Sequence, residues 1–298
     1  MKIVKKEPVC KGWSHDKKYC VTDEKGERFL LRVSDMAQYE AKRSEFMMMR
    51  RVASLGIPMC LPIEFGVSEE GVYSIQSWID GESAEDLIPL LPSREQYNYG
   101  LEGGRILRRI HSIPAPDSQE DWAARFNRKI DTKVRKYSEC PLKYPNGQAF
   151  IDCVNANRHL LNGRPQTYQH GDYHIGNMMI SRNRQLYIID FDRNDYGDPW
   201  EEFNRIVWSA QKSPSFASGM ADGYFDGDVP ADFWRLLALY ISSNMLSSLY
   251  WAIPYGEKEV RTMLNQAEEV LTWYNGMTNT VPSWYTDHTP AEKEKGAL

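Results

Sequence analysis

The sequence predicts an α+β protein with a small β-rich amino-terminal lobe and a larger, mainly helical carboxy-terminal lobe. Residues 1–80 hold short runs of β-branched and aromatic residues around one long amphipathic stretch, whereas residues 81–298 mostly follow a helical period. The only strand signals of the second lobe lie in YQHGDYHIGNMMISRNRQLYIIDFDRNDYGDP, residues 168–199. Acidic and amide side chains flank both apolar runs of that stretch, so it is the first candidate for a functional site.

The amino-terminal lobe is expected to form a sheet with a single helix. DEKGE and SEEG are turn signals, and each separates two apolar runs. A helical pattern over residues 36–55 ends at Gly56, with Pro58 just beyond. The expected strands are residues 19–22, 28–33, 63–67 and 72–79.

The carboxy-terminal lobe is expected to be built from helices. A run without charged side chains begins at Leu236 and ends before Glu257, but several serines and an asparagine interrupt it, which favours a buried helix over a membrane span. The expected helices are Ser93 to about His111, residues 117–136, and others near Gln148, Glu201, Asp232 and Glu257.

Composition excludes several classes of protein. The 298 residues are 42% apolar and 26% charged, with a net charge of −5, which is ordinary for a soluble globular chain. The five cysteines form no CxxC pair or zinc spacing, so they are expected to be reduced thiols. The amino terminus has no apolar h-region, and no basic stripe is present. We therefore expect a cytoplasmic protein that binds neither nucleic acid nor membrane.

The stretch 168–199 combines residues suited to a magnesium site. If its hairpin turn is centred between residues 183 and 184, Asn177 and Asp190 lie opposite each other at the open end. Amide and carboxylate oxygens are ligands that Mg²⁺ accepts, usually together with substrate phosphates. Asp172 precedes Asn177 by five residues and can serve as a general base or orienting group.

HGDYHIGN followed by IIDFD resembles the catalytic segment of the aminoglycoside phosphotransferase family, the small-molecule branch of the protein-kinase-like fold. This resemblance implies a kinase-like two-lobe fold with Asp172 as the catalytic aspartate and Asn177 and Asp190 as Mg²⁺ ligands. His170 is expected to hold the catalytic loop through hydrogen bonds. The implied phosphoryl donor is ATP or GTP.

The resemblance also directs attention to the first lobe. Arg32, in RFLLRVSD, occupies the strand position where the family usually has a phosphate-binding lysine. Glu45 is expected to pair with it, because a glutamate on the inward face of a helix needs a partner. The residues expected on that inward face are Ala41, Met48, Val52 and Leu55.

Two further contacts with the nucleotide are expected. The loop KGWSHDKKYCV contains only one glycine, so the backbone amides around Ser14 and the charge of Lys17 or Lys18 are candidates for phosphate contacts. Gln76 and Trp78 fall in the strand end that corresponds to the family's hinge, whose backbone would bind the purine.

The prediction of the substrate class is based on the charge of one segment of the sequence. Ten acids against three basic residues give the segment 190–232 a charge of −7. Such a field favours a cationic small molecule, of which an aminoglycoside in an antibiotic-resistance reaction is the first candidate. A solvated acidic face is the simpler interpretation of the same acids. Two further functions stay open: a metabolic kinase for choline, homoserine or fructosamine, and a nucleotide-binding pseudokinase regulator. The candidate substrate-side acids are Asp192, Asp195, Glu201 and Glu202.

Overall fold

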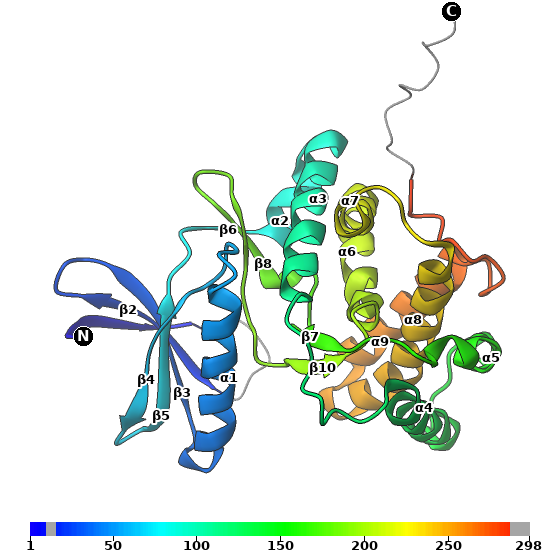
Figure 1. Cartoon of the computed structure of the whole chain (residues 1–298), viewed down its shortest axis with the longest axis horizontal. Coiled ribbons are helices and arrows are strands. Elements are labelled where there is room, and N and C mark those ends of the chain that lie inside the picture. The colour runs from blue at the N-terminus through cyan, green and yellow to red at the C-terminus, as the bar shows by residue number, and fades with distance from the viewer. Residues whose placement is uncertain (10–15, 287–298) are drawn as a thin grey trace, which may run out of the picture. The chain divides into compact units, whose positions relative to one another are not determined.

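The chain forms two compact units, seen in the computed structural model, which describes residues 1–9 and 16–286 (Figure 1). The observed division differs from the expected boundary at residue 80, because a hairpin from the middle of the sequence packs with the amino-terminal residues. The first unit comprises Met1–Leu87 and Asn177–Asn194, and the second comprises Ile88–Gly176 and the chain from Asp195 onward.

A five-stranded antiparallel sheet, in the order β1-β2-β3-β5-β4, forms the body of the first unit. Val21, Leu31, Val33 and Ile75 are buried together and fix which face of the sheet is inward. The structure confirms the four expected strands. It adds β1, which escaped prediction because all six residues of IVKKEP are exposed. The strands are β1 (Ile3–Pro8), β2 (Lys17–Asp23), β3 (Arg28–Ser34), β4 (Pro62–Ser68) and β5 (Gly71–Ser77).

Helix α1 (Tyr39–Ala53) follows the 3₁₀ turn η1 (Met36–Gln38) and packs on β4 and β5 (Figure 1). Its buried residues are Phe46, Met49 and Val52. The expected inward face is therefore displaced by about one residue. Ala41 is exposed, whereas Met48 and Leu55 are only partly buried.

A second, three-stranded sheet explains why residues from the middle of the chain belong to the first unit. Its order is β6-β8-β9, so the segment that follows the first sheet pairs with the later hairpin. Gly81 makes this pairing sterically feasible, because a Cβ there would lie 2.1 Å from the Ile180 carbonyl oxygen. The elements are β6 (Gly81–Ser83), α2 (Ala84–Leu87), β8 (Met178–Ser181) and β9 (Leu186–Ile188).

The second unit is mainly helical, as predicted, with one small sheet in which β7 pairs with β10. Its long helices are α3 (Ser93–Ile110), α4 (Trp122–Glu139), α5 (Gln148–Asn157), α6 (Ile206–Lys212), α7 (Pro214–Phe225), α8 (Ala231–Ala252) and α9 (Glu257–Trp273). Its short elements are η2 (Ile88–Leu90), η3 (Arg158–Leu161), β7 (Thr167–Gln169), η4 (Ile175–Asn177, which ends in the first unit), β10 (Asp195–Gly197), η5 (Glu201–Arg205) and η6 (Ile253–Tyr255).

Glycines bring α3 and α7 into close contact within the second unit. A Cβ at Gly100 would lie 2.2 Å from the Phe216 carbonyl oxygen, and a Cβ at Gly219 would lie 2.2 Å from the Tyr97 carbonyl oxygen. No helix was predicted at the position of α7, whose glycines lower the intrinsic preference for a helix. Here they serve helix packing instead.

The apolar run near the carboxy terminus forms α8 (Figure 1), and most of the residues of this helix are buried. Among the described residues, the segment Ala231–Tyr255 is long and apolar enough to cross a membrane by length and composition alone. Two thirds of its most apolar window is buried inside the protein, as expected of a core helix.

Candidate functional site

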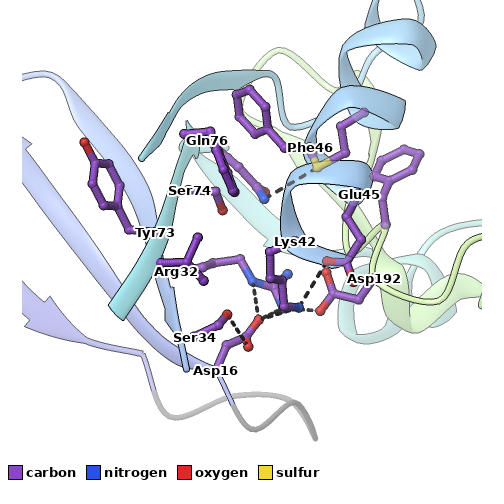
Figure 2. A pocket seen from close by; sticks show the side chains of 14 residues that line it. Asp16, Arg32, Ser34, Lys42, Glu45, Phe46, Tyr73, Ser74, Gln76 and Asp192 are labelled. Carbon is purple, nitrogen blue, oxygen red and sulfur yellow. Dashed lines mark hydrogen bonds and ion pairs between the residues drawn. The ribbon is translucent and has the colours of Figure 1, made fainter. Parts of the chain in front are cut away.

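Arg32 on β3 is the centre of a cluster of charged side chains in the first unit (Figure 2). Its side chain is only 6% exposed. It donates to Asp16 Oδ2 at 2.9 Å, to Asp190 Oδ1 at 3.0 Å, and to Asp192. Burial acts to lower the pKa of Arg32, but the carboxylates of Asp192, Asp190 and Asp16 more than offset burial and raise it. Arg32 is therefore a fixed cation that gathers three carboxylates.

Asp16 is the most buried carboxylate of this cluster, with 5% of its side chain exposed. It accepts hydrogen bonds from Ser34 Oγ at 2.7 Å and from Lys42 Nζ at 3.2 Å, besides its bond with Arg32. Burial acts to raise its pKa, but these donors and charges produce a net lowering. Asp16 was not among the site residues predicted from the sequence.

Glu45 does not pair with Arg32, so that prediction was wrong. Its carboxylate binds Lys42 Nζ at 3.0 Å, three residues earlier on α1. Burial raises the pKa of Glu45, and the attraction of Lys42 opposes that rise. The error follows from the displaced helix face, which carries a lysine beside the glutamate. The i,i+3 spacing of Lys42 and Glu45 was the available signal.

The cluster lines a small cavity of about 20 Å³ (Figure 2). Gln76 also lines it, and its Nε2 lies 3.6 Å from Met49 Sδ. β5 lies between β3 and β4 and ends at Ser77. Gln76 is therefore paired with a strand on each side, at a position inside the sheet rather than beyond its end. Trp78 follows the strand, and the guanidinium carbon of Arg28 lies over the Trp78 ring, 5.8 Å from the ring centroid. Ser14 lies outside the described residues.

Asn177 and Asp190 lie close together at the open end of the β8–β9 hairpin, in a register that differs by one residue from the expected one. Met178 pairs with Ile188, and the Ile189 N–H donates to the Asn177 carbonyl at 3.0 Å. Asp190 is therefore one residue beyond the position opposite Asn177. Its φ of +67° is the left-handed conformation, which reverses the chain after β9.

These donors suit a hard cation. The Asp190 carboxylate is 33% exposed, and Asn177, whose side chain carries an amide oxygen, directly precedes β8. No group of three or more histidine, cysteine or acidic side chains that could hold a metal occurs among the described residues. Magnesium does not require such a group, because it is commonly held by one or two protein oxygens and by substrate phosphates.

The HGD segment of the second unit forms a loop whose backbone N–H groups bind the buried carboxylate of Glu202. Glu202 Oε2 accepts the His170 N–H at 2.6 Å, and Glu202 Oε1 accepts the Gly171 N–H at 2.8 Å. The fully buried His170 ring accepts the Asp172 N–H through Nδ1 at 3.3 Å. Gly171, with a φ of +85°, permits the sharp turn between them.

The Asp172 side chain is 18% exposed and has two basic neighbours. Arg205 Nε lies 3.3 Å from Asp172 Oδ1, and His174 Nε2 lies 3.7 Å from the same oxygen. Neither neighbour was singled out from the sequence. The carboxylate is thus held beside basic groups while part of it remains accessible.

All four of the expected substrate-side acids have other partners. Glu202 is buried and supports the catalytic loop, so it is not available to a substrate. Asp192 belongs to the Arg32 cluster, and Asp195 is exposed and pairs with Arg125 at 3.2 Å. Glu201 lies 3.8 Å from Lys129 and accepts from Gln169.

The remaining acids of segment 190–232 are also largely compensated. Asp198 is fully buried in a bidentate pair with Arg164, and Asp222 accepts from two tyrosine hydroxyls. Asp226 pairs with Arg108, and Asp232 lies 3.8 Å from Arg235. The charge of −7 counted along the segment therefore overestimates the field that a substrate would meet, because most of the opposing cations come from other parts of the chain.

Comparison with known proteins supports the kinase-like interpretation. A family model described as the phosphotransferase enzyme family matches residues 7–236. Among curated proteins, none matches the sequence significantly.

Solved structures share the fold at low sequence identity. A choline/ethanolamine kinase family protein from Mesorhizobium loti is 14% identical with a TM-score of 0.66, covering 93% of this chain and 91% of that one. The GDP complex of a mutant aminoglycoside 2'-phosphotransferase-IIIa has the same identity and TM-score, covering 93% and 94%. A mutant aminoglycoside phosphotransferase APH(4)-Ia, in complex with AMP-PNP and hygromycin B, is 17% identical with a TM-score of 0.65, covering 90% and 93%. The expected kinase-like fold is therefore confirmed.

Proposed function

Because the chain belongs to the phosphotransferase enzyme family, we propose that it transfers the γ-phosphoryl group of ATP to a hydroxyl group of a small molecule. The observation that carries this proposal is the HGD loop. Its aspartate remains partly exposed, while the carboxylate of Glu202 fixes the loop backbone. A preorganised carboxylate of this kind is what positioning a hydroxyl nucleophile requires.

Asp172 is assigned as the group that orients the acceptor hydroxyl and takes its proton. The acceptor oxygen forms a bond to the γ-phosphorus while the bond to the β,γ-bridging oxygen breaks, and ADP leaves. Arg205 and His174, beside the carboxylate, would keep it oriented for this step.

Asn177 and Asp190 are assigned as the residues that would hold Mg²⁺, which neutralises phosphate charge when bound. Their oxygen donors and their adjacency on one hairpin fit that ion. Arg32 binds Asp190 and Asp192, and so fixes the carboxylates of the magnesium segment. Lys42, with Glu45 beside it on α1, supplies the second cation of the cluster.

ATP is the proposed donor, with GTP as the alternative, since related structures were solved with ADP, AMP-PNP or GDP. An aminoglycoside and a choline-like metabolite both remain acceptor candidates, because proteins of both descriptions share the fold. The pairing of the acids removes most of the charge argument for a polycation. We propose a cytoplasmic location with no nucleic-acid or membrane partner.

The direct test measures ADP formation with Mg²⁺ and ATP, first alone and then with a panel of hydroxylated acceptors, in the wild type and in Asp172→Asn. Acceptor-stimulated turnover in the wild type alone supports the proposal. Nucleotide binding without turnover of any acceptor, matched by the variant, would instead favour a pseudokinase regulator.

A further inference from the structure

A cationic region lies in the second unit, where α4, α8 and η5 pack together. Lys133 on α4 is partly buried, and its Nζ donates to Ser243 Oγ on α8 at 3.3 Å. Among the described residues, no carboxylate forms an ion pair with Lys133. A sequestered ammonium group that lacks a counter-ion is unusual, because burying an unpaired charge is costly.

The groups around Lys133 increase this cost. Burial is the main cause that lowers its pKa, to about 7, and the positive charges of Lys129 and Arg205 lower it further. Glu201 is the one acid that acts in the opposite direction, and its carboxylate is already 3.8 Å from Lys129. The surroundings therefore have positive charge in excess of negative charge.

Two buried N–H donors without a hydrogen bond lie on η5 and α8, two of these three elements. Arg205 Nε on η5 is buried and makes no hydrogen bond, although it is 3.3 Å from Asp172 Oδ1. Asn244 Nδ2 on α8, next to Ser243 in the sequence, is buried without an acceptor. Buried donors without acceptors are rare in proteins. Both are N–H groups, so the missing partner is an acceptor of hydrogen bonds.

We infer that Lys133 binds an anionic group of the phosphoryl acceptor, so that the acceptor is a hydroxylated carboxylate or phosphate rather than a polycation. This inference rests on the proposed function, because Arg205 connects Lys133 electrostatically to the proposed base Asp172. A bound anion supplies the counter-charge that Lys133 lacks. A polycation would add repulsion to a region that is already cationic.

The first test reads binding without turnover. Lys133 is labelled with an amine-reactive ester in the presence of Mg²⁺ and AMP-PNP, and the peptide is quantified by mass spectrometry. Lys136, exposed on the same helix and placed over the Tyr250 ring, is the internal control. Glycerate and glycerol 3-phosphate should slow labelling of Lys133 several-fold without affecting Lys136, whereas glycerol and kanamycin should not. The two anions distinguish a carboxylate from a phosphate. Labelling of Lys133 that neither anion slows overturns the inference.

The second test measures turnover of matched acceptors that differ in charge. In Lys133→Gln, the KM of an anionic acceptor should rise about tenfold or more, the value of one lost charge-assisted contact. Lys133→Arg should recover part of the affinity, and Lys136→Gln should behave as wild type. The Kd of ATP should stay constant in all three variants. A parallel loss of ATP affinity in Lys133→Gln would assign this lysine to the nucleotide and overturn the inference.

The two proposals fail in different ways. Efficient phosphorylation of a cationic acceptor, with no protection of Lys133, would retain the phosphotransferase function and reject the anionic substrate. Protection of Lys133 by anions, with no phosphorylation of any acceptor, would retain the anion site and reject the phosphotransferase function.

Discussion

The two charged regions of the molecule, around Arg32 and around Lys133, differ in how their buried charges are balanced. Around Arg32, each buried charge has a partner within ion-pair distance, and four carboxylates share two cations. Around Lys133, an ammonium group is sequestered with cations as neighbours and with a single hydroxyl as its hydrogen-bond partner. The first region has an acidic excess suited to a dication, and the second has a basic excess suited to an anion. Local pairing, rather than the charge of a sequence segment, therefore indicates what each region can bind.

Asp172→Asn should cause the largest loss, because the amide retains the shape of the carboxylate but cannot take the acceptor proton. We expect kcat to fall by about 10²–10⁴-fold, the usual contribution of a general base. Calorimetry should find the affinity for ATP unchanged, since the variant leaves the Arg32 cluster intact. Activity within a few-fold of wild type would remove Asp172 from its assigned role.

Glu202→Ala should have the largest effect on stability. It leaves the N–H groups of His170 and Gly171 without their buried acceptor, at a cost of roughly 2–4 kcal/mol in the free energy of unfolding. Glu202→Gln keeps one acceptor oxygen and should lose about half as much. Urea denaturation gives both values, and kcat at low temperature, where the variants are still folded, reports loop position. Equal stability of the two variants with wild type would contradict the support assigned to Glu202.

Asp190→Asn tests the acidic region of this comparison, where the Mg²⁺ site is proposed. A neutral amide is a weaker ligand for a hard dication, so we expect the Mg²⁺-dependent part of nucleotide affinity to fall about tenfold. Calorimetry with and without Mg²⁺ separates this part from the rest. Asp195→Asn, an exposed acid paired with Arg125, is the matched control. If the dependence on Mg²⁺ is unchanged, Asp190 is not the metal ligand, and Asp192 is the next candidate.

Most of the fold followed from short-range patterns in the sequence. Strands β2–β5 were predicted because runs of β-branched and aromatic residues flank the turn signals, and α3 was predicted with nearly its full length. The elements that were missed depend on distant partners. β1 has no buried residue, β6 pairs with the distant strand β8, and the glycines of α7 are required by α3. No local pattern reports such contacts.

The candidate site shows the same division. Asp172, Asn177 and Asp190 could be selected because a single stretch of sequence carries all three. The partner of Glu45 was misassigned, because the choice between Arg32 and Lys42 depended on a displacement of the helix face by one residue. The acids after Asp190 were misinterpreted because most of their counter-ions are distant in sequence: Arg125 and Arg164 precede the segment.

Lys133→Met should have the smallest effect, and in the opposite direction from the other variants. The folded-state pKa of Lys133 is lowered from 10.5 to about 7, so the unfolded chain binds more protons between those values. Stability of the wild type should therefore rise with pH through that window, while at neutral pH and below this lysine is a burden on the folded state. The charged groups that act on it are Lys129 on α4 and Arg205 and Glu201 on η5, while α8 contributes the Ser243 hydroxyl.

Removing the amine should raise the Tm at pH 7 by roughly 2–4 °C and flatten the slope of stability between pH 7 and 10. Thermal unfolding of both proteins across that range checks the sign. A wild-type slope that Lys133→Met retains would show that other groups titrate there, and that Lys133 is already charged and paired in the folded protein.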